Sequence, residues 1–253
     1  MKQLLKDRVI DWVRGYLNSF GGNTKAIIGI SGGKDSTVAA KICVEAVGAD
    51  RVIGVRMPQG TQHDIDVSRK VCEYLGIKSY EINIGETCDV LAKTIGTEMK
   101  VATREHPVYY SNTPARIRMA TLYGVAAILG DSRVVNTCNR SEDYVGYSTK
   151  FGDSAGDFSP LSSLTVKEVK TLGYQLGIPR EFIDKTPEDG LSGKTDEDNL
   201  GFTYDTLDDY LLFGRKPEQE TLEKIERMHK NNLHKLQLMP AFIGNEWNKP
   251  SKE

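Results

Sequence analysis

A short run of small and charged residues, Ser31-Gly32-Gly33-Lys34-Asp35-Ser36, carries the groups that bind a phosphate chain. Its two glycines can adopt positive φ angles and allow a phosphate to approach the backbone closely. Its serines supply hydroxyl donors, and Lys34 supplies positive charge. Asp35 would repel a phosphate unless a divalent cation lay between them, so its presence indicates Mg²⁺. The run therefore predicts a site for a polyphosphate and a metal ion.

The residues around this run predict a strand before it and a helix after it. Lys25–Ile30 is mainly apolar, and residues 36–47 have helical character. A helix N-terminus presents unpaired N–H groups and the positive end of its dipole to an anion. The run differs from the commonest phosphate loop, which needs glycine at 28 and a hydroxyl at 35, whereas this chain has Ile28 and Asp35. The alternative is an ordinary strand–helix turn made of small residues.

Apolar patterning along the chain alternates between strands and helices. Further strands are expected at 51–56, 79–84 and 133–137. Further helices are expected at 3–19, 64–75, 86–101, 113–129 (with Thr113 as N-cap and Pro114 first), 165–177, 204–213 and 217–238. This alternation predicts an α/β fold, a three-layer doubly wound parallel sheet with helices on both faces and further C-terminal helices. Ligands of such sheets bind beyond the carboxyl ends of the strands.

A long polar stretch, 138–163, follows the fourth expected strand, and we expect it to be a functional loop. Glu142 within it is a candidate second Mg²⁺ ligand, because two carboxylates together with phosphate oxygens suit an octahedral ion. Thr137, just before the stretch, could bond the adenine or ribose of a nucleotide. The alternative for Glu142 is a solvent-exposed side chain, which is common for a glutamate after a strand.

Three further polar groups could hold an anionic substrate. Arg116 and Arg118 lie near an expected helix N-terminus, but residues two apart do not share a helix face, so at most one contacts a given ligand. Lys150 lies in a segment with aspartates and glycines that is alternatively a plain surface loop. His234 and Lys235 form a pair that is alternatively solvent-exposed.

Composition limits the classes to which this chain can belong. Its 253 residues suit one large or two small domains, and without a clear interdomain linker we expect a single domain covering 1–253. The content of 39% hydrophobic and 27% charged residues is ordinary for a globular protein. A net charge of −2 does not suggest a surface for nucleic acid or membrane, and neither a membrane span nor a signal peptide is expected. Four scattered cysteines without a C-x-x-C pair indicate buried thiols of a cytoplasmic protein rather than a zinc site.

In combination, these motifs resemble ammonia-dependent NAD synthetase in its short bacterial form, within the ATP pyrophosphatase (PP-loop) superfamily. The similarity extends from Gly29 to Lys235. It implies an adenine nucleotide alpha hydrolase-like fold, a homodimer, Mg²⁺ as cofactor and ATP as co-substrate. The implied reaction is amidation of nicotinic acid adenine dinucleotide (deamido-NAD). ATP adenylates the nicotinate carboxylate and releases pyrophosphate, and ammonia then displaces AMP.

The resemblance also implies roles for individual residues, which fall into three sets. ATP would be bound by Gly29, Ile30, Ser31, Gly32, Gly33, Lys34, Asp35, Ser36, Thr137 and Lys167. The metal ion would be held by Asp35 and Glu142, and these two together with Lys34 would be the catalytic residues. Deamido-NAD would be bound by Arg116, Lys150, Asp157, His234 and Lys235.

The chain departs from the family pattern near two of these residues. In the family's G-T-x-H-x-x-E motif, Asn136 stands in place of the glycine and Asn139 in place of the histidine. In the family, a lysine that contacts the ATP phosphates often comes immediately after a Leu-Thr pair. Here Val166 comes immediately after Leu164-Thr165, and Lys167 stands one position later. The stretch 185–199 resembles the family's lid, which orders over ATP.

Two other functions are compatible with parts of the sequence. Another PP-loop enzyme, acting on tRNA, would need a basic surface and often paired cysteines. A nucleotide-binding sensor without catalysis would keep the glycine-rich loop but would have no need of Asp35 together with Glu142. For a synthetase we expect free ammonia as the nitrogen donor, unless a separate glutaminase docks, because the sequence contains no glutamine-hydrolysing domain.

Overall fold

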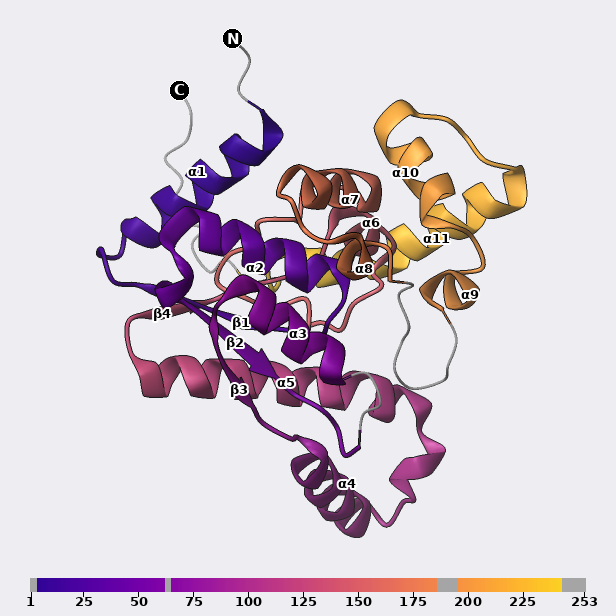
Figure 1. The fold of residues 1–253 in the computed structure, drawn as a ribbon. Coiled ribbons are helices and arrows are strands. Elements are labelled where there is room, and N and C mark those ends of the chain that lie inside the picture. The colour runs from indigo at the N-terminus through magenta and orange to yellow at the C-terminus, as the bar shows by residue number, and fades with distance from the viewer. Residues whose placement is uncertain (1–3, 62–64, 186–194, 243–253) are drawn as a thin grey trace, which may run out of the picture.

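The computed structural model describes residues 4–61, 65–185 and 195–242, and four parallel strands in the order β3-β2-β1-β4 form the centre of that part (Figure 1). They are β1 (Lys25–Gly29), β2 (Val52–Arg56), β3 (Lys78–Glu81) and β4 (Ser132–Val134). Ile27 pairs with Ile53 of β2 on one side and with Val134 of β4 on the other. The topological switch point therefore lies between β1 and β4.

Helices surround this sheet, with short 3₁₀ turns at Ala49–Arg51 and Thr103–Glu105. The first five are α1 (Leu5–Asn18), α2 (Lys34–Val47), α3 (Ile65–Leu75), α4 (Gly85–Met99) and α5 (Pro107–Leu129). Next come α6 (Arg140–Val145), α7 (Val166–Gln175), α8 (Arg180–Ile183), α9 (Asp196–Leu200), α10 (Tyr204–Phe213) and α11 (Gln219–Leu236). The expected α/β class is confirmed.

Different helices cover the two faces of the sheet, because neighbouring residues of β1 point to opposite sides. Ile28 packs in a core that includes Leu17 of α1 and Leu172 of α7, all fully buried. Ile27 packs on the other face with Leu122 of α5. Figure 1 shows α1, α2 and α7 on one side of the strands and α5 on the other. The sheet is thus the middle of three layers, as expected.

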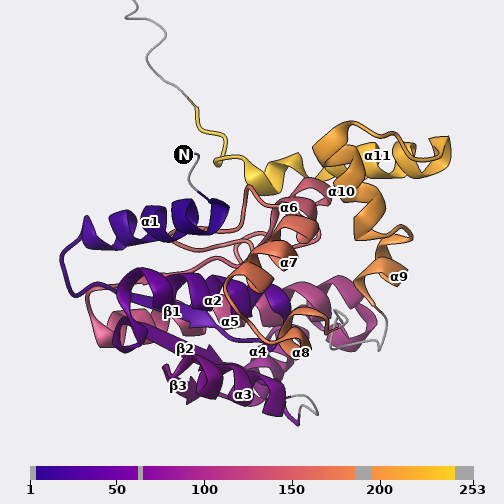
Figure 2. The same cartoon turned by 45° about the horizontal axis from the view of Figure 1, so that its top comes forward.

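The C-terminal helices form a separate cluster beside the sheet rather than on one of its faces (Figure 2). Val145 of α6, Leu207 of α10 and Ile225 of α11 are fully buried together. This packing supports α6, which follows the carboxyl end of β4. None of the described helices combines the length and the apolar character of a membrane span.

The start of α5 differs from the expected one. The helix begins at Pro107, so Pro114 lies inside it and Thr113 is not its N-cap. Pro107 occupies the first helical turn, where a missing N–H costs nothing, and therefore provides the same start signal earlier in the chain.

Two short helices lie in stretches that we expected to be irregular. At the start of α6, the Asn139 side chain accepts from the Glu142 N–H while the Glu142 side chain accepts from the Asn139 N–H. Such a capping box pairs two otherwise unpaired donors and favours a helix here. Thr195 and Asp198 form a similar box at the start of α9. Of the expected lid at 185–199, residues 186–194 lie outside the described residues.

Candidate active site

The loop after β1 leads directly into the N-terminus of α2, as the sequence predicts. Gly33 is the N-cap residue and Lys34 begins the helix. Gly32 has a φ of +84°, and a Cβ at this position would lie 3.1 Å from the backbone nitrogen of Ser68. Only glycine adopts that conformation in that space without strain. Glycine is therefore required here because α3 packs closely against this loop.

The side chains of the two serines form hydrogen bonds within the loop. The Oγ atoms of Ser31 and Ser36 lie 3.1 Å apart, and Ser31 Oγ accepts a hydrogen bond from the Gly33 N–H at 3.2 Å. Ser36 Oγ also donates to the Gly33 carbonyl at 3.1 Å. With Gly29 and Ile30 at the end of the strand, all the residues expected to form the ATP loop lie together at the carboxyl end of β1.

Lys34 and Asp35 form an ion pair within this loop. Lys34 Nζ lies 2.7 Å from Asp35 Oδ2, and the lysine side chain is only 3% exposed. Burial opposes the lysine charge, but the carboxylates of Asp35 and Glu142 outweigh it and raise the pKa of Lys34. A buried positive charge therefore stands at the start of α2, where an anionic ligand would also find the helix N-terminus.

Asn139 brings the two candidate metal ligands together. Its Nδ2 donates to Asp35 Oδ1 at 3.0 Å, and its backbone N–H donates to Glu142 Oε2 at 3.2 Å. Burial and the like charge of Asp35 raise the pKa of Glu142 well above its usual range, although Lys34 opposes this. The loops after β1 and β4 thus meet at the switch point, as their positions in the sheet predict.

The donor set of Asp35 and Glu142 fits a Mg²⁺ ion. Two partly buried carboxylates repel each other, and a divalent cation between them would remove that repulsion. Among the described residues no group of three or more histidine, cysteine, aspartate and glutamate side chains is arranged to hold a metal. Mg²⁺ commonly binds through one or two carboxylates and completes its shell with waters and phosphate oxygens, which two carboxylates beside a phosphate loop would allow.

Asn136 fixes the path of the chain between β4 and the half-buried Thr137. Its Nδ2 donates to the Asp153 and Ala155 carbonyls at 2.8 and 3.0 Å. Its Oδ1 accepts from the Cys138 N–H at 3.0 Å. The asparagine that replaces the family's glycine therefore ties the strand end to the 153–155 turn and sets where Thr137 lies.

Four of the five residues expected to bind deamido-NAD lie close together. Arg116 Nε donates to the Lys150 carbonyl at 3.2 Å, and Lys150 Nζ donates to the His234 carbonyl. Lys235 Nζ donates to the carbonyls of Gly146 and Ser148. Segments from α5, the 146–150 loop and α11 therefore converge in one basic cluster.

The side chain of the fifth residue, Asp157, forms hydrogen bonds with residues outside that cluster. Its Oδ2 accepts from the Val134 N–H at 2.7 Å, and its Oδ1 accepts from the Tyr123 hydroxyl at 3.2 Å. The carboxylate therefore satisfies a backbone donor of the edge strand β4. Its expected role toward the dinucleotide stays a prediction.

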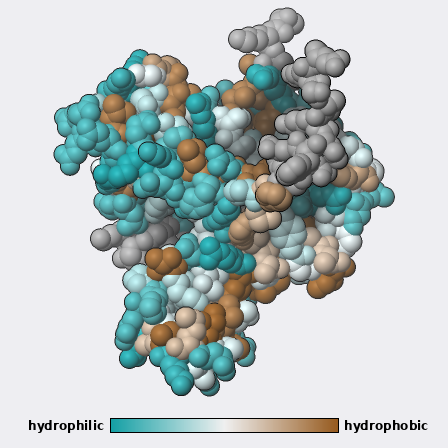
Figure 3. Space-filling view, turned by 180° about the vertical axis from the view of Figure 1, so that it is seen from behind, coloured by the Kyte–Doolittle hydropathy of each residue, from teal (hydrophilic) through white to brown (hydrophobic). Residues whose placement is uncertain are grey.

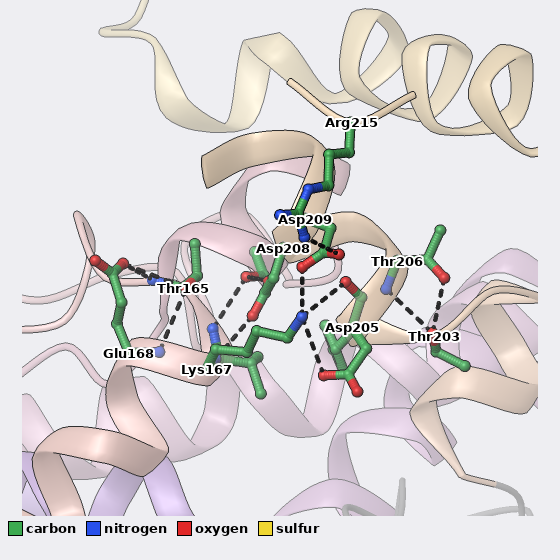
Figure 4. A network of polar contacts seen from close by, with 12 residues as sticks. Thr165, Lys167, Glu168, Thr203, Asp205, Thr206, Asp208, Asp209 and Arg215 are labelled. Carbon is green, nitrogen blue, oxygen red and sulfur yellow. Dashed lines mark hydrogen bonds and ion pairs between the residues drawn. The ribbon is translucent and has the colours of Figure 1, made fainter. Parts of the chain in front are cut away.

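Lys167 points toward α10, as Figure 4 shows. Its Nζ lies 2.6 Å from Asp209 Oδ1 and 3.3 Å from the Asp205 carbonyl oxygen. The hydrogen bond to Asp209 is the main cause of a raised Lys167 pKa. Arg215 binds the other carboxylate oxygen of Asp209 at 3.2 Å. The lysine expected to touch ATP thus has acidic partners in the C-terminal helices, and its expected role stays a prediction.

Sequence reasoning missed Asp208, which joins three helices. This fully buried carboxylate accepts from the Ser141 hydroxyl of α6 and, at 2.7 Å, from the Lys167 N–H at the start of α7 (Figure 4). It lies on α10, so it holds that helix against the segment that carries Glu142. The sequence contained one indication of this role: Asp208 is an acidic residue on the apolar face of the helix expected at 204–213.

The parallel sheet, the anion loop after its first strand and the carboxylates at its switch point define an α/β protein of the PP-loop class. The family model for NAD synthase matches residues 5–240, and the chain belongs to that family. The NH(3)-dependent NAD(+) synthetase of Methanocaldococcus jannaschii is 40% identical over 231 residues, covering 85% of this chain and 87% of that protein. The synthetase of Methanococcoides burtonii is 37% identical over 245 residues, covering 91% of each.

Solved structures agree with this assignment. NMN synthetase from Francisella tularensis superposes with a TM-score of 0.84 at 32% identity, covering 95% of this chain and 97% of that one. NH3-dependent NAD synthetase from Campylobacter jejuni superposes with a TM-score of 0.74 at 26% identity, covering 94% and 97%. The fold is therefore shared over nearly the whole of each chain.

Proposed function

We propose that this protein amidates deamido-NAD with ammonia, using ATP and Mg²⁺, and releases NAD, AMP and pyrophosphate. The observation that carries the proposal is the meeting of Asp35 and Glu142 beside the buried ammonium of Lys34. A site with this charge pattern suits a polyphosphate bound through a divalent cation. Membership of the NAD synthase family, and relatives that are NH(3)-dependent NAD(+) synthetases, favour deamido-NAD as the carboxylate substrate.

The chemistry requires activation of a carboxylate. A carboxylate is a poor acyl donor because its leaving group would be oxide, and adenylation makes AMP the leaving group instead. For this step the nicotinate carboxylate must approach a polyphosphate that is also negative. Lys34 and the N–H groups at the start of α2 reduce this repulsion and stabilise the departing pyrophosphate. A bound Mg²⁺ supplies further positive charge at the phosphate oxygens.

No covalent intermediate on the protein is needed, and the cysteines are poorly suited to form one. The reactive form of cysteine is the thiolate. Burial raises the pKa of Cys43 to about 12, and it raises the pKa of Cys138 well above its usual value. We therefore assign the second step to direct attack of ammonia on the adenylate.

The basic cluster of Arg116, Lys150 and Lys235 is our proposed site for the dinucleotide. These side chains come from three separate segments that backbone carbonyls link. Arg116 donates to the Lys150 carbonyl, Lys150 to the His234 carbonyl, and Lys235 to the Ser148 carbonyl. Guanidinium and ammonium groups suit the two phosphates of deamido-NAD. His234 contributes its carbonyl to the same cluster through Lys150.

A coupled assay tests the proposal. The protein is given ATP, Mg²⁺, deamido-NAD and either ammonium or glutamine, and both NAD and pyrophosphate are measured. We expect equal amounts of both products with ammonium and little turnover with glutamine. Pyrophosphate without NAD would point to a different carboxylate substrate. ATP binding without any turnover would favour a nucleotide sensor.

A second candidate substrate is nicotinic acid mononucleotide. The observation in its favour is that the Francisella NMN synthetase exceeds the Campylobacter NAD synthetase in both TM-score and sequence identity to this chain. Measuring kcat/KM for the mononucleotide and the dinucleotide separates the two. A ratio above about ten in favour of the mononucleotide would replace our first assignment.

We also propose a homodimer. Large apolar side chains are exposed on α4 and α5, among them Val90, Val108 and Ile128 at 58%, 69% and 86%. Figure 3 shows apolar surface in the lower half of the molecule, where these helices lie. Exposed apolar patches on globular proteins commonly mark interfaces. Analytical ultracentrifugation should give twice the chain mass of 28.1 kDa, and a monomer for Ile128→Glu would place the interface on α5.

We further propose that residues 1–253 act as one domain in the cytoplasm. The family match over 5–240 includes both the sheet and the C-terminal helices, which favours one functional unit. All four cysteines are free thiols, as is usual in a reducing compartment. Limited proteolysis tests the first point, and cell fractionation with an antibody against the protein tests the second.

A further inference from the structure

The hydroxyl of Tyr204, at the start of α10, is buried and has no hydrogen-bond partner among the described residues. Only 4% of the residue is exposed. Buried polar groups are nearly always paired, because an unpaired one has lost water without gaining a replacement. An exception beside a binding site suggests that the bound molecule supplies the missing partner.

Tyr204 belongs to the charged centre of the site. Lys34 Nζ lies 5.9 Å from the centroid of the Tyr204 ring. Burial, followed by the negative charges of Glu142, Asp196 and Asp35, raises the pKa of Tyr204 well above its ordinary value. The phenol therefore keeps its proton at neutral pH and has a hydrogen bond to donate.

Asp35 and Glu142 accept hydrogen bonds from groups other than this tyrosine. Asp35 accepts from Asn139 through Oδ1 and from Lys34 through Oδ2. Glu142 accepts from the backbone of Asn139. The Tyr204 hydroxyl thus bonds neither carboxylate, although the charges of both act on its pKa.

The helix that carries Tyr204 is firmly placed. Asp208, one turn further along α10, accepts from Ser141 of α6 and from the backbone of Lys167 (Figure 4). The neighbouring residue Thr203 caps the helix by accepting from the Thr206 N–H. The tyrosine therefore occupies a position set by α6 and α7 rather than by a mobile loop.

We propose that the Tyr204 hydroxyl donates a hydrogen bond to a phosphate oxygen of bound ATP. A phosphate oxygen is a negatively charged acceptor, which a protonated phenol recognises. The inference rests on the proposed function, because it requires ATP and a divalent cation beside Asp35 and Glu142. It gives the C-terminal helices a direct contact with the substrate.

The test is Tyr204→Phe, which removes only the hydroxyl. Because that group is unpaired in the free protein, its loss should leave the unfolding temperature unchanged or raise it. Affinity for Mg-ATP, measured by calorimetry, should fall about tenfold. Two more titrations check the acceptor. The affinity for ATP without metal should fall as well, because the phosphate oxygen is still present. The affinity for Mn²⁺ alone, followed by electron paramagnetic resonance, should stay unchanged.

Tyr210→Phe is the matched control on the same helix. The Tyr210 hydroxyl donates to Glu226 at 2.6 Å, so its removal should lower the unfolding temperature and leave Mg-ATP affinity unchanged. The inference is overturned if Tyr204→Phe binds Mg-ATP and ATP as the wild type does, or if it loses stability as Tyr210→Phe does. A wild type that binds Mg-ATP but forms no NAD would refute the proposed function alone, since these titrations do not need turnover.

Discussion

Asn139 links the two acidic residues of the site: its side chain donates to Asp35 Oδ1 at 3.0 Å across 104 positions of sequence. The Asn139 side chain also accepts from the Glu142 N–H at 3.0 Å, and the backbone N–H of Asn139 donates to the Glu142 carboxylate. One asparagine therefore sets the distance between both proposed metal ligands. Asn139, which stands where the motif that the sequence resembles has a histidine, therefore bonds both acidic residues of the site.

Replacing Asn139 by aspartate tests that link. Asn139→Asp keeps an acceptor for the cap of α6 but places a carboxylate oxygen against Asp35. Adding Asp35→Asn restores an amide–carboxylate pair with donor and acceptor exchanged. The free energy of unfolding of the double variant should exceed the additive expectation by about 1–3 kcal/mol. Urea denaturation of the four proteins measures this coupling, and additive effects would show that the contact does not stabilise the fold.

Replacing Glu142 by glutamine should stabilise the metal-free protein at neutral pH. Burial, and next the charge of Asp35, raise the pKa of Glu142 well above its ordinary value of 4.5. The folded protein therefore holds this proton more tightly than the unfolded chain, and the wild type loses stability as pH rises above that value. A glutamine side chain does not titrate, so the stability of the variant lacks this pH-dependent contribution. Thermal unfolding in EDTA should give similar midpoints near pH 4.5 and a higher midpoint for Glu142→Gln near pH 8.

Glu168→Gln is the control for this experiment. Glu168 occupies the same capping-box position in α7, beside Thr165 rather than beside another carboxylate. Its replacement tests the cap alone. If both variants show the same pH dependence, repulsion between Glu142 and Asp35 is not its cause. Turnover with Mg²⁺ should be lost only in Glu142→Gln.

Replacing Gly32 by alanine should damage the anion loop. The φ of +84° costs an L-residue about 1–2 kcal/mol, and the added Cβ would lie 3.1 Å from the Ser68 nitrogen. We expect a loss of stability of that size together with weaker ATP binding. Gly22→Ala is the control, because a Cβ at Gly22 has no atom within 4 Å. Equal ATP affinity in the two variants would show that the loop shape is not required.

Lys167 and Asp209 distinguish a structural ion pair from an ATP contact. The two side chains are 36% and 33% exposed, so their pairing contributes less than about 1 kcal/mol. If Lys167 also serves ATP, as the family resemblance implies, Lys167→Met should raise the KM for ATP about tenfold, a typical loss for a charged hydrogen bond. Asp209→Asn should leave that KM unchanged. Equal kinetic effects of the two variants would assign Lys167 to the ion pair alone.

The anion loop was predictable because its determinants are local. An apolar strand, two adjacent glycines and the following helix stand next to one another in the sequence, and Lys34 and Asp35 are neighbours. The meeting of Asp35 with Glu142 was predictable for a different reason. In a parallel sheet the carboxyl ends of neighbouring strands lie at the same edge.

The contacts that hold this site depend on tertiary structure and were not predictable. The six residues of α6 are too few to show helical periodicity, although the Asn139-x-x-Glu142 capping signature was present. The pairing of Lys167 with Asp209 depends on how α7 packs against α10. The bond from the Val134 N–H to Asp157 joins residues that no local pattern relates.

The central claim is amidation through an adenylated carboxylate, and oxygen labelling tests it most directly. Deamido-NAD carrying ¹⁸O in its nicotinate carboxylate is incubated with the protein, ATP, Mg²⁺ and ammonium, and the products are analysed by mass spectrometry. The account predicts one labelled oxygen in each AMP, with AMP and NAD formed in equal amounts. NAD formed with unlabelled AMP would contradict it.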